Sequence, residues 1–363
     1  MNTKFNNKIK SKEKTKIFQR IDWPNPKEDT WKYTKIDYEL FNSVFKKIKK
    51  DEIIITKSRN KIETIVEKNI DNWIKKKDIN DKIEALNSDY YNNGLFIEIK
   101  SNEKLESKYT SFLEGLYNTK NIIIVNQKTN FNYIQTNTIN KGIFRTEFTK
   151  IYLKANSKMN FYLFIDTNEE SQNIINIDVY LGKNSFFNII TAQKKGKLNR
   201  LKINVYHNKG ESDSKIYSSF LGNNNDLIDI TTNTIHSSLN TKSDILVKGV
   251  LNQNSQSIYR GKIKINKNAQ KTISFLSDHS LLLGETSKSF SIPSLEIDAN
   301  DVKASHSAST GKIEKEILFY LMSRGIKKEE AENLITKGFL IDIFNRINDE
   351  VIKQKFIDFF ENK

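Results

Sequence analysis

The fold is decided by a stretch in the middle of the chain, Ile175-Asn176-Ile177-Asp178-Val179-Tyr180-Leu181-Gly182-Lys183-Asn184-Ser185. Its aliphatic residues alternate with other residues, which is the period of a half-buried β-strand. The glycine, asparagine and serine that follow are typical turn residues. The stretch therefore predicts a β-strand that ends near residue 181 and enters a tight turn.

The same strand-and-turn pattern recurs along the centre of the chain, and no convincing helix interrupts it. If Asn156, Asn184, Asn208 and Asn268 mark equivalent turns, the steps are 28, 24 and 60 residues, and the last is two steps of 30. Ragged repeats of this length indicate a parallel β-helix or solenoid. A β-sandwich is the structural alternative, because strand spacing alone does not separate the two. We expect no α-helix longer than two turns between residues 93 and 300.

Towards the C-terminus the pattern changes from strand to helix. Pro293 has no N–H for a ladder and marks the end or edge of a strand. Small polar residues follow and place His306 in a turn or loop. Glycines then predict helix ends at Gly325 and Gly338. The expected C-terminal helices cover 314–324, 328–337 and 339–360.

The two ends of the chain carry other helical signals. An apolar stripe with Ile343, Ile347 and Val351 lies outside the repeats and offers either a packing face or a partner-binding face. Residues 1–20 form a lysine-rich arm, and helix-like patterns cover 39–50 and 62–77. The sequence therefore predicts an N-terminal arm and helical region (1–92), a mainly β core (93–300) and a C-terminal helical domain (301–363).

Composition excludes several kinds of chemistry. The chain of 363 residues has no cysteine, which excludes disulfides, thiolate ligands and thiol nucleophiles. Its net charge is +15, but the basic residues are interleaved with acidic ones, so nucleic-acid binding is not favoured. No run of eighteen apolar residues predicts a transmembrane helix. No Walker A loop, nucleophile elbow, zinc-binding His pair on one helix or dinucleotide fingerprint is found, and we expect no enzymatic activity.

Several separate blocks resemble the SufB/SufD family of the SUF iron–sulfur cluster assembly system. The resemblance is carried in order by Pro293–Ile297, Asp301–His306, Leu318–Leu321 and Ser323–Ile326. Near the N-terminus, Lys27–Thr34 resembles the family block E-x-W-K-Y-T, and Asn93–Ile99 resembles the entry into the family's central domain. The resemblance implies a right-handed parallel β-helix core, which agrees with the repeats.

The resemblance also implies a function and partners. It indicates a non-enzymatic, SufD-like scaffold subunit that pairs with SufB through the β-helix and binds the SufC ATPase through the C-terminal helices. A homodimer is expected to be possible when the subunit is alone. No cofactor would be held permanently, although an iron–sulfur cluster or iron would pass transiently through the interface with SufB. The expected location is the cytoplasm, or a plastid if the source is a plastid-bearing eukaryote.

The resemblance singles out His306 as the candidate site residue. The family block reads Cys-Ser-His in SufD-type chains, and here Ala304 replaces the cysteine while the histidine is kept. Imidazole binds iron or relays protons near neutral pH, so His306 is a candidate metal ligand, with a turn histidine as the alternative. Ser307 stands where SufB-type chains carry a glutamate, which favours SufD over SufB. Asp278 and His279 are weaker candidates near the same interface.

Other readings remain open for particular residues. The remaining histidines, His207 and His236, are expected to face outward or to form structural hydrogen bonds. Trp31 and Tyr33 are expected to anchor the N-terminal arm to the core. A carbohydrate-active β-helix enzyme is the rival function, and it would need paired carboxylates in a groove, for which the candidates are Glu296, Asp298 and Asp301. A nucleic-acid-binding solenoid rests on charge alone.

Overall fold

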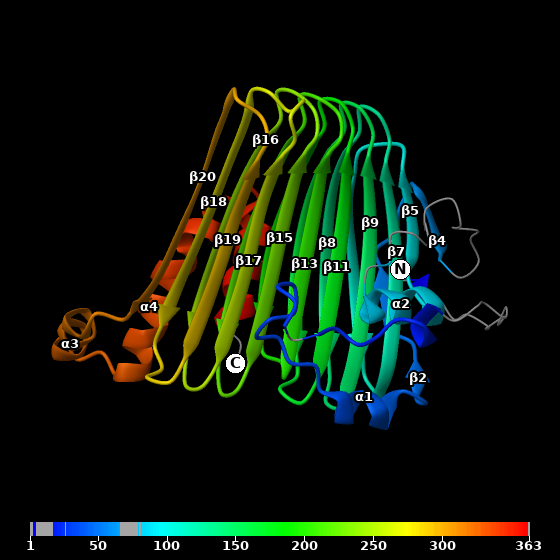
Figure 1. Cartoon of the computed structure of the whole chain (residues 1–363). Helices are drawn as coiled ribbons and strands as arrows, with labels where there is room; N and C mark the ends of the chain where they lie inside the picture. Colours follow the sequence, from blue (N-terminus) through cyan, green and yellow to red (C-terminus); the bar gives the residue numbers. More distant parts are fainter. Residues whose placement is uncertain (1–2, 5–16, 26, 66–78, 80, 362–363) are drawn as a thin grey trace.

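The central part of the chain winds into a parallel β-solenoid of about eight turns, and helices precede and follow it in the chain (Figure 1). The structure is a computed structural model that describes residues 3–4, 17–25, 27–65, 79 and 81–361. Each turn contributes one strand to each of two facing sheets, and neighbouring strands from β5 to β20 are parallel in both. This parallel order excludes the antiparallel β-sandwich. No helix interrupts residues 93–300, as the sequence predicts.

The two sheets are built from alternate strands of the chain. Sheet A has the order β1-β3-β6-β8-β10-β12-β14-β16-β18-β20, and sheet B has the order β19-β17-β15-β13-β11-β9-β7-β5-β4, with β2 paired to β7. The strands are β1 (Thr3–Lys4), β2 (Ile48–Lys49), β3 (Glu52–Ile55), β4 (Lys61–Thr64), β5 (Leu95–Ile99), β6 (Glu103–Ser111), β7 (Gly115–Val125), β8 (Asn130–Ile139), β9 (Ile143–Leu153), β10 (Lys158–Thr167), β11 (Gln172–Leu181), β12 (Phe186–Lys194), β13 (Leu198–His207), β14 (Asp213–Gly222), β15 (Leu227–His236), β16 (Lys242–Leu251), β17 (Gln256–Ile265), β18 (Thr272–Leu282), β19 (Lys288–Ile297) and β20 (Val302–Lys312).

Inward side chains of successive turns stack into one long apolar core. In β11, Ile175, Ile177 and Val179 are fully buried between the sheets, which confirms the strand predicted there. The alternation buries one side chain in two because successive side chains point to opposite faces of a strand. The turns close tightly through left-handed residues, and Asn184 Nδ2 donates to Asn156 Oδ1 of the previous turn at 2.8 Å. Stacking of equivalent residues thus defines the repeat.

The turn markers chosen at Asn208 and Asn268 are wrong. The left-handed residue that continues the series from Asn156 and Asn184 is Glu211, followed by Asn240 and Lys271. The turn that contains Glu211 spans residues 208–212, one residue longer than the turn at 182–185, so the choice of asparagine as a marker shifted the repeat. The strand register itself advances smoothly, as shown by Lys158 opposite Phe186 and Phe186 opposite Asp213.

N-terminal helices cover the outer face of sheet B. The 3-10 helix η1 (Ile17–Gln19), α1 (Tyr38–Val44) and α2 (Lys82–Tyr90) pack there around Phe18, Phe41 and Leu86. The expected helix over 39–50 is therefore shorter and is followed by β2. The expected helix over 62–77 lies largely outside the described residues, and its first residues belong to β4 instead.

C-terminal helices cover the outer face of sheet A, behind the strands in Figure 1. They are α4 (Lys328–Phe344) and α5 (Glu350–Glu361), whereas α3 (Lys315–Ser323) precedes them and has no buried residue. Gly338 does not end a helix, because α4 runs through it to Phe344. Of the two roles that the sequence allows for the apolar stripe, the packing face is confirmed for Ile343 and Ile347, which are buried against sheet A, while Val351 is exposed. None of the described helices is long and apolar enough to cross a membrane.

The solenoid extends further than the sequence indicates. The C-terminal helical domain was expected from residue 301, but β20 occupies Val302–Lys312 and completes the last turn of sheet A. The first C-terminal helix therefore begins at Lys315. His306 lies in the middle of β20, so its predicted placement in a turn or loop is wrong. Its small polar neighbours resemble loop residues because this last strand is exposed on almost every side chain.

Candidate functional site

The last turn of the solenoid ends in two open strand edges. β19 is the terminal strand of sheet B and β20 is the terminal strand of sheet A, and no described strand pairs with their outer sides. An unpaired edge presents a row of backbone N–H and C=O groups that can pair with another strand. The predicted site residues gather at this end, on β18 and β20.

Pro293 marks the edge of sheet B, as the sequence predicts. The N–H groups of Lys288 and Asp298 point inward along the sheet and donate to the carbonyls of Ser255 and Ile265. In a parallel ladder, alternate residues bond to the same neighbour. Pro293 belongs to the other set, which faces away from β17, so its missing N–H removes no bond from the sheet.

His306 lies on the inner face of the last strand. It is opposite Leu276 of β18, which is 1% exposed in the core, and paired residues of neighbouring strands point to the same face. No described strand covers β20, so the His306 side chain is exposed. Ala304 points the same way and packs against the core, where the family cysteine would stand. The histidine is thus presented at the open end of the solenoid.

Asp278 lies on the same inner face, one turn deeper. It is opposite Ala308, so it is a diagonal neighbour of His306 across the β18–β20 pair. Its side chain is buried, and neither carboxylate oxygen has a hydrogen-bond partner in the described residues. The Ser291 hydroxyl faces it from β19 without forming a hydrogen bond of normal geometry. Burial raises the pKa of Asp278 to about 6, because the charged form loses its hydration.

His279 points to the opposite face of the strand from Asp278. Its Nδ1 atom lies 2.7 Å from Ser309 Oγ, and it is opposite Lys248 on the outer face of sheet A. Partial burial lowers the pKa of His279, the nearby Lys248 ammonium lowers it further, and Asp342 of α4 opposes both effects. The structure therefore brings Asp278 and His306 to one face and separates His279 from them.

The remaining two histidines form a buried stack inside the solenoid. The rings of His207 and His236 lie 4.3 Å apart at 14°, and every ring nitrogen is within hydrogen-bond distance of a serine or threonine hydroxyl. Burial lowers the pKa of both, to about 3 for His236. The prediction of structural, hydrogen-bonded histidines is confirmed, although both rings point inward and not outward.

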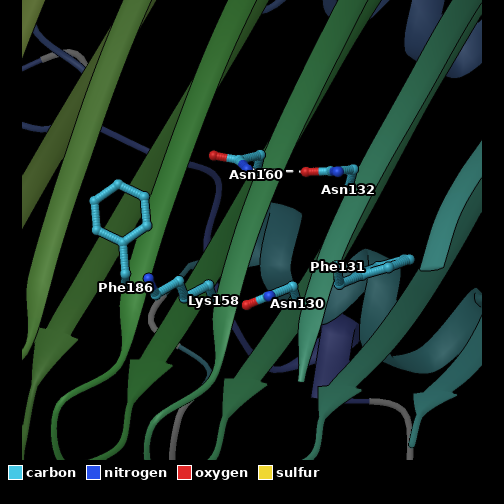
Figure 2. A pocket seen from close by; sticks show the side chains of 6 residues that line it. All are labelled: Asn130, Phe131, Asn132, Lys158, Asn160 and Phe186. Atoms are coloured by element: carbon cyan, nitrogen blue, oxygen red, sulfur yellow. Dashed lines mark hydrogen bonds between the residues drawn. The ribbon is translucent and has the colours of Figure 1, made fainter. Parts of the chain in front are cut away.

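Two hollows of the surface lie away from these residues. One lies where β8, β10 and β12 begin and is lined by Asn130, Lys158 and Phe186 (Figure 2). Asn132 and Asn160 also line it, and Asn160 Nδ2 donates to Asn132 Oδ1 at 2.8 Å in a ladder that joins neighbouring turns (Figure 2). This hollow contains no carboxylate or histidine. Among the described residues, no group of three or more His, Cys, Asp or Glu side chains is arranged to hold a metal ion.

The carboxylates expected for a sugar-binding rival do not form a facing pair. Glu296 points to the outer face of sheet B, where Lys262 and Lys264 bind its carboxylate. Hydrogen bonding to Lys262 lowers the pKa of Glu296. Asp298 and Asp301 lie in the turn between β19 and β20. Glycoside hydrolysis needs one carboxyl group with a raised pKa opposite a second one, and Glu296 does not have that environment.

Among the described α-helices, α3 is the one with no buried residue, although it is strongly apolar. None of its residues is buried, and Phe319 is 73% exposed with Tyr320 at 55%. It projects from the open end of the solenoid together with the beginning of α4 (Figure 1). The sequence shows this feature in the run Ile317–Met322, which is apolar on every side of the helix. Such a helix is normally buried, so its exposure here indicates a surface for another protein.

The comparison with known families fits this geometry. The family model described as the SufBD core domain of SUF-system FeS cluster assembly matches residues 110–339. The match covers more than half of the chain and includes the solenoid from β7 through both open edges. The chain belongs to the SufBD family. It is therefore a SUF-system iron–sulfur cluster assembly protein, and the family expected from the blocks at residues 293–326 is confirmed.

Curated relatives support the SufBD assignment. The chain is 35% identical to the iron–sulfur cluster assembly protein SufD of Bacillus subtilis over 160 residues, which are 44% of this chain and 36% of that protein. It is 31% identical to SufD of Escherichia coli over 150 residues, which are 41% of this chain and 36% of that protein. A SufBD family protein of Synechocystis is 36% identical over 136 residues, 38% of this chain and 28% of the relative. The matches thus span about a third of the relatives' length.

The anchor predicted from the N-terminal block is confirmed for Trp31. Its side chain is buried, and the Arg200 guanidinium lies 3.9 Å from the centre of a ring of the indole. The residues that bind this block are not evident from the sequence pattern. They are Arg200, Asp229 and Arg260 on the outer face of sheet B, where buried charges form two ion pairs at 2.8 Å. The signal that could have revealed them is a pair of outward charges in register, Arg200 on β13 and Asp229 on β15, with Arg260 on β17 opposite Thr231, two residues along the strand from Asp229.

Proposed function

We propose that this SufBD family protein is a SufD-like, non-enzymatic scaffold subunit that pairs with SufB and binds the SufC ATPase. The observation that carries the proposal is the position of His306 on an open strand edge at the end of the family's core domain. An exposed imidazole at an unpaired edge can be reached by a second subunit that docks there. The relatives named SufD support the same assignment.

SufB would pair with the open end of the solenoid. β20 offers an exposed edge of eleven residues, most of them small, and small side chains allow another backbone to approach closely. Edge strands are otherwise an aggregation risk that proteins cover or block. Pairing with SufB would cover the inner face of the last turn and bury His306 in the interface. A second copy of this chain could occupy the same end when SufB is absent.

SufC would bind the exposed face of α3 and the beginning of α4. The aromatic residues Phe319 and Tyr320 supply large contact areas, which are typical of interface hot spots. The far end of α4 is attached to sheet A, where Lys248 binds Asp342 at 3.1 Å and neighbours His279 in register. Motion of SufC during ATP hydrolysis could therefore reach the last turn through α4.

The iron–sulfur cluster, or iron on its way to one, would be a transient cargo at the interface with SufB. His306 would bind iron through a ring nitrogen or relay a proton. Asp278 would supply a carboxylate that lacks other partners in the described residues. Ala304 offers no thiolate, so sulfur ligands would come from SufB. The proposed location is the cytoplasm, or a plastid in a plastid-bearing eukaryote.

The test is co-purification of the tagged chain with SufB and SufC from the same source. Wild-type protein should retain both. Phe319→Asp should lose SufC and keep SufB, because the change puts a charge on an exposed apolar helix that is outside the two edge strands. The matched control is Val351→Asp, a similar change at a site that is 65% exposed on α5. Failure of the wild-type chain to retain either protein would overturn the proposal.

A further inference from the structure

The N-terminal block places an aromatic ring beside the open edge of sheet B. Tyr33 stacks on Phe290 of the edge strand β19, with ring centroids 4.6 Å apart and an interplanar angle of 12°. The Tyr33 side chain nevertheless remains 46% exposed. Next to Phe290 on the same outer face, Ile292 is 37% exposed. These three residues, which we name the Tyr33 patch, form an apolar surface that continues to the unpaired side of β19.

The backbone of Tyr33 is held in an unfavourable conformation. Its φ is +69°, in the left-handed region that residues with a side chain rarely adopt. The other described non-glycine residues with positive φ all lie in turns between solenoid strands. Strain of this kind persists only where the surroundings enforce it, and it often marks a functional position.

A buried charge cluster enforces the position of Tyr33 from both sides. Asp229 accepts hydrogen bonds from Thr34 Oγ1 and from the guanidinium groups of Arg200 and Arg260. Arg260 also donates to the carbonyl oxygens of Lys32 and Asp29. The residues before and after Tyr33 are therefore fixed to sheet B, and the ring is held over Phe290.

We infer that the Tyr33 patch is a second contact surface for the SufB subunit that pairs with the open end of the solenoid. This inference rests on the proposed function. A strand added beside β19 would lie about 4.8 Å away. Its outward side chains would then be cross-strand neighbours of Phe290 and Ile292, within reach of Tyr33.

The chemistry of the patch defines what SufB would place on it. The exposed side chains of Lys32 and Lys288 border the aromatic pair, and the Lys32 ammonium lies 5.3 Å from the centre of the Tyr33 ring. An aliphatic or aromatic side chain flanked by acidic residues would match this surface. The N-terminal block thus shapes the partner surface as well as anchoring the chain.

The test compares SufB binding by full-length wild-type protein and by Tyr33→Gly, using calorimetry with purified SufB. Glycine adopts positive φ freely, so the variant removes the ring while relieving the strained backbone. Its thermal unfolding temperature should stay within a few degrees of wild type. Its dissociation constant for SufB should rise about tenfold, the size of effect that a lost aromatic contact at an interface produces. Tyr33→Phe should bind like wild type.

Lys128→Gly is the matched control, because Lys128 also has positive φ, at 57°, but lies in the turn between β7 and β8. It should bind SufB like wild type. Equal binding by Tyr33→Gly and wild type would overturn the inference and leave SufB pairing intact. No SufB binding by the wild-type chain would instead overturn the proposed function. Weakened self-association with unchanged SufB binding would assign the patch to a second copy of the chain.

Discussion

Helix α5 is expected to stay docked on the outer face of sheet A through its buried Phe356 side chain, and Phe356→Ala tests this. The Phe356 side chain is fully buried, with ring centroids 4.3 Å from Phe164 on sheet A and 6.3 Å from Phe344 of α4. Truncation of a buried phenylalanine to alanine costs about 3–5 kcal/mol, because transfer energy is lost and a cavity remains. Undocking of α5 should therefore become between about a hundredfold and several thousandfold more frequent.

Hydrogen–deuterium exchange followed by mass spectrometry measures that opening directly. In Phe356→Ala, amides of α5 should exchange much faster than in wild type, and amides of β12 beneath it should follow to a smaller extent. Val351→Ala on the same helix is the control, and a change at so exposed a side chain should stay within about 0.5 kcal/mol. Equal exchange in the two variants would refute the conclusion that this helix packs on sheet A.

Three further predictions concern buried ionisable side chains. Asp229→Asn should lower the free energy of unfolding in urea by about 3–5 kcal/mol, because it leaves the buried guanidinium groups of Arg200 and Arg260 without a counter-charge; a loss under 1 kcal/mol would contradict this. Burial lowers the pKa of His236 to about 3, whereas a histidine in the unfolded chain has a pKa of about 6.5. The unfolded chain therefore binds the proton first, and the free energy of unfolding falls as the pH drops below 6.5. Wild-type protein should lose about 2 kcal/mol more unfolding free energy between pH 7 and pH 5 than His236→Gln does. Equal losses in the two proteins would show that the His236 ring is not buried in its neutral form. Burial raises the pKa of Asp278 to about 6, so its ionised form destabilises the fold increasingly between pH 4 and pH 6. Asp278→Asn should stabilise the isolated chain by about 1–3 kcal/mol at pH 8 and have no effect near pH 4. Destabilisation at pH 8 would contradict this and show that the carboxylate has a stabilising partner in the folded chain.

The repeating core was predictable because its signal is local and occurs many times. Alternation in stretches such as Ile175–Leu181 defines each strand, and stacking of such strands needs no further information. The exact length of a turn was not predictable from residue types. Asn208 looked like the marker asparagines, yet Glu211 adopts the left-handed conformation, because position in the turn decides the backbone and not the side chain alone.

The ends of the solenoid were harder to predict because tertiary contacts override local signals there. Gly338 is a plausible helix end, but packing on sheet A carries α4 past it to Phe344. Small polar residues around His306 suggest a loop, but pairing with β18 makes them a strand. The family resemblance selected His306 first, with Asp278 and His279 together as weaker candidates, whereas the strand register shows that Asp278 shares a face with His306 and that His279 does not.

The central claim is that His306 at the open end acts in cluster assembly with SufB. The measurement is the iron and sulfide content of complexes in which His306→Ala is co-expressed with SufB and SufC. The variant should fold normally and pair with SufB, since an exposed change costs within about 0.5 kcal/mol, but it should show a clear loss of cluster that Ala304→Cys does not restore. Ser305→Ala, on the opposite face of β20, is the control and should load normally. Wild-type iron and sulfide in His306→Ala would contradict the claim and leave the subunit as a scaffold alone.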